Sequence, residues 1–179
     1  MMYNLGGGYD RVWVRFYFQL TAPITSIMKF LRFYDSPSFN TPLGGFFMGS
    51  GTLIFSAGTD EENQSITTWI GLNQAQVIDG QWHSLEIDYW RNGDPSGYPS
   101  QAFWFDGTSV SMPDGPNVHF AGAGNNSYWQ GGRLYSGQRA STSRLGAIEW
   151  IGTLNAGNLT TGQVNLDRIA ISTVGRIGP

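Results

Sequence analysis

The stretch from Asp79 to Gly107 constrains the fold more than any other part of the sequence. From Trp82 to Arg91 the side chains alternate with a period of two, which is the spacing of a half-buried strand. One face carries His83, Leu85, Ile87 and Tyr89, and the other carries Trp82, Ser84, Glu86, Asp88 and Trp90. A loop of turn-forming residues and a second short strand follow, and Asp106-Gly107 closes that strand as a tight turn. The stretch therefore predicts a long hairpin with one apolar face and one face of carboxylates and indoles.

Similar alternation predicts strands along most of the chain. They are expected at 11–20, 27–34, 45–48, 52–57, 65–71, 145–152 and 164–172. The strand at 27–34 is apolar on both sides except for Lys29 and Arg32, so we expect it to be central in its sheet. No stretch longer than a turn or two has helical periodicity. Many short strands in one chain predict an all-β fold, a two-sheet antiparallel sandwich.

Length and composition indicate a single domain covering residues 1–179. Residues 1–10 form a glycine-rich lead. In the long segment 111–144, glycine and proline interrupt every periodic run, so we predict an irregular loop region with one short strand near 118–121.

Charge and residue content exclude several classes of partner. A hydrophobic fraction of 40% with 13% charged residues excludes intrinsic disorder. The net charge of −3 is spread without runs, and a nucleic-acid partner would need a basic patch. No window approaches the roughly 18 apolar residues of a membrane span, so no membrane partner is expected. There are no cysteines, and the first residues lack the basic start and apolar region of a signal peptide.

Three segments resemble the concanavalin A-like, laminin-G-like jelly roll. They are Trp82-His83-Ser84-Leu85-Glu86, Phe105-Asp106-Gly107 and Leu166-Asp167-Arg168-Ile169-Ala170-Ile171-Ser172-Thr173. Residues 12–16 and 29–33 also resemble the polysaccharide-lyase-like group of these domains. The resemblance implies a jelly-roll sandwich, a fold that hosts lectins, hydrolases, lyases and structural modules. Such domains usually have a strand before the one at Arg11, so we expect either the lead or a neighbouring subunit to complete that sheet edge.

The outward face of the predicted sheet is the candidate glycan-binding site. Aromatic faces stack on sugars, and charged side chains read their hydroxyl groups. The candidate residues are Trp13, Arg15, Tyr17, Arg32, Glu86, Asp88, Trp90, Trp104, Tyr128 and Trp129. Tyr128 and Trp129, together with Arg133 in the same segment, are expected either as rim contacts or as part of a plug over the face. The alternative is that segment 111–144 folds over this face and buries it as a second small core.

Catalytic patterns are incomplete. Glu86-Ile87-Asp88 resembles the paired carboxylates of family sixteen glycoside hydrolases, but Trp90 and Arg91 stand where the third acid would be. A lyase needs a base, and His83 lies on the apolar face, which favours a satisfied core residue; the other histidine is His119. Of the lyase motifs, Tyr-x-Lys is absent, and Gln-x-His occurs as Gln81-Trp82-His83, whose histidine lies on the apolar face. We therefore predict no catalytic residues and favour a protein that is not an enzyme.

No cofactor or metal site is predicted. Asp167 and the Asp106-Gly107 turn offer oxygen ligands of the kind that calcium prefers, and relatives often hold that ion. Two scattered carboxylates do not make a site, so calcium stays the less favoured alternative.

The functional hypothesis is a non-catalytic β-sandwich module at a virion surface, a phage decoration or attachment subunit with a glycan-competent face. Its expected partners are other protein subunits, in a homo-oligomer or a capsid or tail assembly, together with polysaccharide. The alternative is a secreted, extracellular protein whose signal has been removed. That protein would be a polysaccharide lyase, a glycoside hydrolase or a carbohydrate-binding module.

Overall fold

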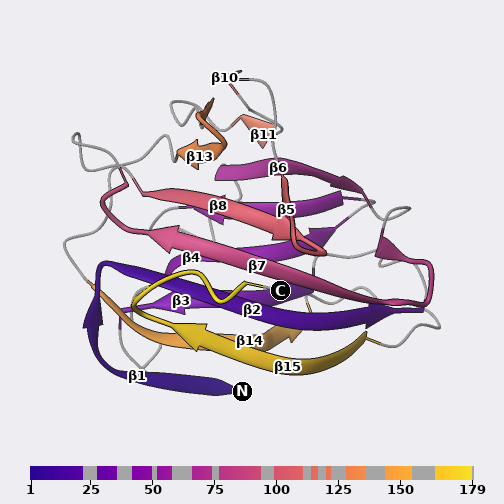
Figure 1. The fold of residues 1–179 in the computed structure, drawn as a ribbon, viewed down its shortest axis with the longest axis horizontal. Helices are drawn as coiled ribbons and strands as arrows, with labels where there is room; N and C mark the ends of the chain where they lie inside the picture. The colour runs from indigo at the N-terminus through magenta and orange to yellow at the C-terminus, as the bar shows by residue number, and fades with distance from the viewer. Residues whose placement is uncertain are drawn as a thin grey trace.

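The computed structural model of the chain is a sandwich of two antiparallel β-sheets (Figure 1). It describes residues 1–21, 28–35, 42–49, 52–57, 66–73, 77–93, 99–110, 114–116, 120–121, 128–135, 144–154 and 164–178. The predicted all-β, two-sheet fold is confirmed, and it is a jelly-roll sandwich. Within these residues we find no helix long and apolar enough to cross a membrane.

Sheet A contains seven strands of the described part of the chain. In spatial order they are β1 (Met2–Tyr9), β14 (Leu145–Leu154), β3 (Met28–Tyr34), β4 (Pro42–Gly49), β5 (Thr52–Ala57), β6 (Ile66–Asn73) and β11 (Phe120–Ala121). β3 lies between β14 and β4, which confirms the central position predicted from its two apolar sides. β4 and β5 pair with each other as predicted.

Sheet B carries the long hairpin from which the fold was predicted. In spatial order its strands are β10 (Gly115–Pro116), β12 (Tyr128–Gln130), β13 (Arg133–Tyr135), β8 (Ser100–Phe105), β7 (Trp82–Trp90), β2 (Arg11–Leu20) and β15 (Val164–Ser172), with β9 (Thr108–Val110) paired to β8. β7 and β8 form that hairpin. Asp106 and Gly107 both have positive φ, 48° and 78°, in the turn from β8 to β9, as a two-residue hairpin turn requires.

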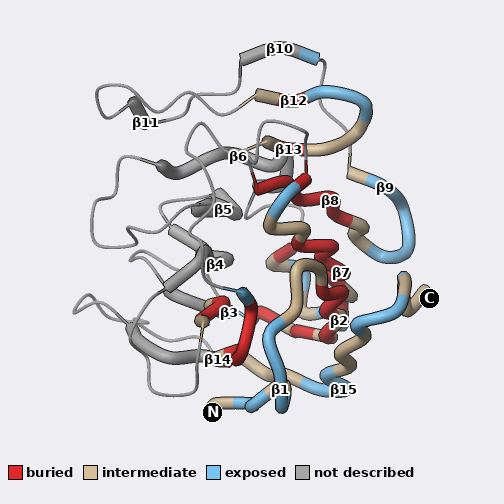
Figure 2. Tube along the Cα trace, turned by 90° about the vertical axis from the view of Figure 1, so that its left-hand side faces the viewer, coloured by how far each residue is buried: buried red, intermediate tan, exposed pale blue. Residues whose placement is uncertain are grey.

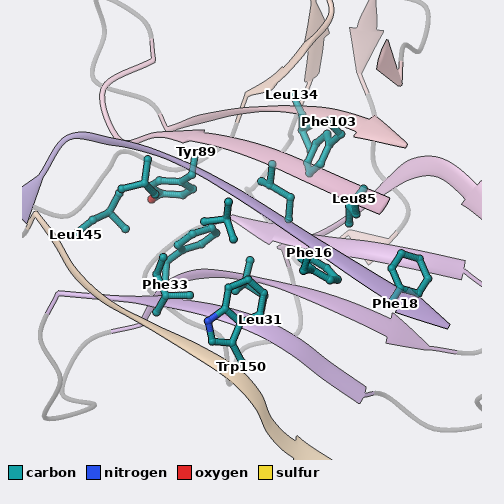
Figure 3. Packing of buried hydrophobic residues seen from close by; sticks show 14 of the residues in the cluster. Phe16, Phe18, Leu31, Phe33, Leu85, Tyr89, Phe103, Leu134, Leu145 and Trp150 are labelled. Atoms are coloured by element: carbon teal, nitrogen blue, oxygen red, sulfur yellow. The ribbon is translucent and has the colours of Figure 1, made fainter. Parts of the chain in front are cut away.

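The core lies between the two sheets (Figures 2 and 3). Phe16 of β2 meets Trp150 of β14 edge-on with ring centroids 5.3 Å apart, and Phe33 of β3 stacks on Tyr89 of β7 at 4.8 Å. All four side chains are buried, and burial raises the pKa of Tyr89 far above its ordinary value. Because side chains alternate along a strand, the residues of β2 and β7 that lie between core positions point to the outer face of sheet B.

The glycine-rich lead completes the edge of sheet A. Residues 2–9 form β1, which pairs with β14 through Met2 opposite Glu149 and Asn4 opposite Ala147. The Trp150 backbone N–H donates to the Met1 carbonyl at 2.7 Å, and the N-terminal ammonium donates to the Trp150 carbonyl at 2.9 Å. Of the two expected ways to complete this edge, the structure shows the lead.

The described residues of segment 111–144 contain more strand than predicted. The expected short strand is present as β11, but β12 and β13 form a hairpin where only irregular structure was predicted. Gly131 and Gly132, with φ of 57° and 75°, make its two-residue turn. The prediction was wrong because adjacent glycines interrupt a periodic run, yet they are also the residues that this turn requires.

A bulge in β15 breaks the alternation predicted for the last strand. Leu166 pairs with Phe18 and Ile171 pairs with Val14, so β15 holds one extra residue between these pairs. Arg168 takes a φ of 49° there. As a result Leu166 and Ile171 both pack against the core, and Ile169 turns toward solvent with 38% of its surface exposed.

Candidate functional site

The outer face of sheet B is built by the predicted alternation. Val12, Val14, Phe16 and Phe18 enter the core from β2, which leaves Trp13, Arg15 and Tyr17 on the opposite face. The strand register sets Trp13 opposite Asp88, Arg15 opposite Glu86, and Glu86 opposite Trp104. Seven of the predicted site residues therefore share one face: Trp13, Arg15, Tyr17, Glu86, Asp88, Trp90 and Trp104.

A groove of about 480 Å³ opens on this face, and we call it the arginine groove. It is lined by Arg11, Trp13, Asp88, Ala102, Trp104, Ser109, Gly131, Gly132, Arg133 and Arg176. Three guanidinium groups and one carboxylate line it, so its side chains carry a net charge of +2 although the whole chain carries −3. The groove is thus locally positive, although the protein as a whole is acidic.

Asp88 fixes two of these arginines. Its carboxylate is 1% exposed and accepts a forked pair of hydrogen bonds from Arg11, Nε to Oδ1 at 2.8 Å and Nη2 to Oδ2 at 2.7 Å. Arg133 donates from Nη1 to the same Oδ2 at 2.7 Å and from Nε to the Ser100 hydroxyl at 2.9 Å. The hydrogen bonds with Asp88 raise the pKa of Arg11 above its ordinary value.

The indole faces are already occupied by guanidinium groups. The Arg11 guanidinium carbon lies 4.5 Å from the ring centroid of Trp13 and 4.8 Å from that of Trp90. The Arg176 guanidinium carbon lies 4.4 Å from that of Trp104. Trp13 is only 9% exposed. In this structure these tryptophans hold arginines by cation–π contact, so the groove presents guanidinium groups to a ligand more than open indole platforms.

The two carboxylates of the Glu86-Ile87-Asp88 pattern have structural partners. Glu86 is 3% exposed; its Oε1 accepts from the Ile177 backbone N–H at 2.7 Å and its Oε2 from Arg176 Nε at 3.3 Å. Both oxygens of Asp88 are bonded to arginine, as described above. With each oxygen occupied by a protein donor and shielded from solvent, neither carboxylate is placed to exchange a proton with a substrate.

Arg32 does not belong to this face. It lies on β3 in sheet A, where its Nη1 donates to the Tyr34 hydroxyl at 3.0 Å and to Glu149 Oε2 at 3.5 Å. The prediction was wrong because alternation tells which side of a strand a residue occupies, but not to which of the two sheets the strand belongs.

Trp129 is also corrected. It is 1% exposed and packs in the core with its ring 6.3 Å from that of Phe103, so it is not a rim contact. Its neighbour Tyr128 points the opposite way, is half-buried, and stacks on Tyr135 with ring centroids 5.0 Å apart. Tyr128 is not among the residues that line the arginine groove. The rest of segment 111–144 lies largely outside the described residues.

His83 is a satisfied residue at the edge of the core, as predicted. It is 8% exposed, its Nδ1 lies 2.8 Å from Asp106 Oδ2, and its Nε2 lies 3.0 Å from Asp79 Oδ1. Burial acts to lower the pKa of His83, but the hydrogen bonds with Asp106 and Asp79 outweigh it, and the pKa is raised above 6.5. His83 points away from the groove, and His119 lies outside the described residues.

The residues considered for calcium have other contacts. Asp106 accepts the Ser84 backbone N–H on Oδ1 at 2.8 Å and contacts His83 through Oδ2. Asp167 accepts the Arg168 backbone N–H at 2.8 Å. Within the described residues, no three histidine, aspartate or glutamate side chains group as metal ligands would.

Two of the three groove arginines, Arg11 and Arg176, were not predicted, and Arg133 was expected only as a possible rim contact. Arg11 could have been found, since it shares the parity of Trp13 at the start of a strongly alternating strand. Arg133 belongs to a three-residue strand and Arg176 follows the end of β15, and neither position has a periodic pattern around it. Only the fold brings them to the groove.

Comparison with known proteins identifies similar solved structures but no family. No protein-family model matches the chain, and no curated protein matches it. The endo-β-1,4-glucuronan lyase of the fungus Trichoderma reesei is 14% identical over 97% of this chain and 73% of its own, with a TM-score of 0.49. The alginate lyase Aly36B, solved with an alginate trisaccharide, is 10% identical over 94% and 73%, with a TM-score of 0.48. The binding domain of botulinum neurotoxin serotype D/C is 11% identical over 88% and 31%, with a TM-score of 0.44. Likeness at this level concerns the fold alone.

Proposed function

We propose that this chain is a non-catalytic β-sandwich module that binds an acidic glycan in the arginine groove. The observation that carries the proposal is a set of three arginines that line one groove of an otherwise acidic protein. Each of them pairs with a carboxylate and lies over an indole ring, Arg133 with its guanidinium carbon 5.8 Å from the ring centroid of Trp90. Guanidinium groups bind carboxylate and sulfate groups through charge-assisted, often forked hydrogen bonds. A chain of acidic sugars repeats such groups at regular intervals and suits a groove better than a single anion does.

The arrangement of Arg11 and Arg133 favours binding, because these two side chains need little further ordering. Arg11 lies between two indoles, and Arg133 is bonded to Asp88 and Ser100. Side chains that are already immobile lose little conformational entropy when a ligand arrives. The alternative, a polysaccharide-active enzyme, would need a free acid or base in the groove, and the described lining residues offer only the arginine-bound Asp88 and Ser109.

Replacing Arg176 by alanine is expected to weaken binding of an acidic polysaccharide about 10-fold or more, the usual consequence of losing one charge-assisted contact. The measurement is isothermal titration calorimetry against a polyuronate, a sulfated polysaccharide and a neutral glucan. Arg168→Ala is the matched control, because it removes the same charge from a side chain that is 78% exposed and lies outside the groove.

Equal losses in the two variants, or equal binding of the neutral glucan, would contradict the proposal. A turnover assay on the same polymers runs in parallel. If the wild-type protein releases new polysaccharide chain ends, the protein is an enzyme and the proposal of a non-catalytic module is wrong.

We further propose that the module acts as a subunit of a larger assembly, of which the phage virion surface is the case that the sequence favours. β1 and β15 are edge strands of the two sheets and lie at the same side of the sandwich (Figures 1 and 2). Between them is a depression of about 250 Å³ lined by Met1, Tyr3, Trp150, Ile169 and Ile171. Met1, Tyr3 and Ile169 are 83%, 51% and 38% exposed, and exposed apolar side chains gathered at sheet edges are typical of contact surfaces.

A second copy of the chain is the proposed occupant of this depression. Light scattering is expected to give a defined oligomer for the wild-type protein, and Ile169→Asp should shift the mass toward the monomer because it places a charge in the contact. Val174→Asp is the control, since Val174 is 94% exposed and lies outside the depression. A monomeric wild-type protein at high concentration would refute this assembly.

A further inference from the structure

Residues 173–178 follow β15 and fold back across the outer face of sheet B. In Figure 1 this segment, which we call the strap, leaves the end of β15 and crosses in front of β2. It begins with a turn in which the backbone N–H groups of Val174 and Gly175 donate to the Ser172 hydroxyl at 3.3 and 3.2 Å. It carries Arg176 to its place over Trp104, so the strap supplies one of the three cations of the arginine groove.

Glu86 holds the strap. Its two oxygens accept from the Ile177 backbone and from Arg176 Nε, at 2.7 and 3.3 Å. Arg176 also donates from Nη2 to the Gly107 carbonyl at 3.5 Å. Among the described residues, Glu86 is the one carboxylate that holds Arg176, beside the stacking on Trp104 and the longer hydrogen bond to Gly107.

Glu86 has a second cation beside it. Arg15 is its cross-strand neighbour in the β2–β7 register, and both residues line a small pocket that Gly178 of the strap also lines. Yet the Nε and Nη1 atoms of Arg15 are buried and have no hydrogen-bond acceptor in the structure, within its described part. Buried donors left unpaired are unfavourable, and they would be relieved if Glu86 turned to them.

We propose that Glu86 is a positioning residue with two alternative partners, Arg176 and Arg15. The arginine to which the Glu86 carboxylate is bonded then determines whether the strap completes the groove. With Glu86 on Arg176, as in this structure, the strap is closed and the groove has its three cations. With Glu86 on Arg15, the strap is released and the groove loses Arg176. Because an acidic glycan interacts with Arg176 only in the closed arrangement, binding shifts the population toward it. This inference rests on the proposed function for the identity of the ligand. The switch of Glu86 between its two partners does not depend on that function.

Hydrogen exchange at the Ile177 amide reports the strap directly, because this N–H is bonded to Glu86. Glu86→Gln, which keeps an acceptor but loses the charge, is expected to speed exchange of this amide about 10-fold. Arg15→Met removes the competing partner and is expected to slow exchange several-fold. Asp167→Asn is the control, a neutralised carboxylate on the same sheet that does not contact the strap. Core amides such as that of Tyr89 serve as the reference for global stability.

The slowing by Arg15→Met is the decisive result, because a merely structural role of Arg15 would leave exchange unchanged or make it faster. If hydrogen exchange is unchanged or faster while the core amides are unaffected, the proposal that Glu86 switches between Arg176 and Arg15 is wrong. These measurements use the free protein, so they do not depend on whether a glycan binds. A polyuronate that binds in calorimetry should slow Ile177 exchange further; binding without that effect would show that the strap does not complete the groove.

Discussion

Trp129→Ala is expected to lower the free energy of unfolding by about 3–5 kcal/mol, the usual cost of removing a large aromatic side chain from a core. Trp129 is 1% exposed and packs with Phe103 and the rest of the core cluster, at the point where β12 joins sheet B. Removing the indole leaves a cavity that the short strands β12 and β13 can fill only in part. The measurement is denaturant unfolding followed by circular dichroism.

Trp129→Phe is the matched variant for this prediction. It keeps an aromatic ring in the same space and removes the indole N–H, which is buried without a hydrogen-bond acceptor in the described structure. Its cost should therefore be well below that of alanine. If Trp129 were instead a glycan contact, alanine would abolish binding and leave the unfolding curve in place, and that result would contradict the core position.

The second large effect is expected from Asp88→Asn, which should lower the free energy of unfolding by about 3 kcal/mol. The variant keeps the shape of the side chain but removes the charge that Arg11 and Arg133 share. Their side chains are 36% and 19% exposed, so water can reach them in part, and the expected loss lies at the low end for a broken buried ion pair. Denaturant unfolding at neutral pH measures it.

Asp10→Asn supplies the comparison, because Asp10 also bridges two arginines, Arg91 at 2.8 Å and Arg144 at 3.0 Å. The hydrogen bond from Arg91 holds the pKa of Asp10 below its ordinary value, but the side chain is 41% exposed. Solvent screens such a pair, and the loss should be about 1 kcal/mol or less. Equal losses of unfolding free energy for Asp10→Asn and Asp88→Asn would contradict the prediction, because burial of the Asp88 carboxylate would then not strengthen its ion pairs.

Much of the face that carries the site could be predicted from periodicity alone. Trp13, Arg15 and Tyr17 lie where their parity in β2 places them, and the same holds for Glu86 and Asp88 in β7. Alternation is reliable in these strands because each has one side in the core, and a slip by one residue would bury the polar set. The alternation predicted for β15 fails after Asp167, because an inserted bulge residue changes parity without leaving a pattern in the sequence.

Contacts between segments that are distant in the sequence determine the chemistry of this face. Sequence periodicity could not predict these contacts. The prediction of open tryptophan platforms did not foresee that Arg11 and Arg176 would cover the rings of Trp13 and Trp104. Glu86 and Asp88 look like a catalytic pair as a sequence pattern, but their partners are Ile177, Arg176, Arg11 and Arg133. A short motif does not reveal which cations the fold brings to a carboxylate.

Local alternation was enough to predict the main strands, the all-β class and the inward or outward direction of the side chains in β2 and β7. These follow from local alternation, since burying one side of each strand is what stabilises the sandwich. The tertiary structure decided that Arg32 lies in the other sheet, that Trp129 lies in the core, and that Arg133 and Arg176 reach the groove. Sheet membership and long-range ion pairs depend on how strands pair across the whole chain, and no local period records that pairing.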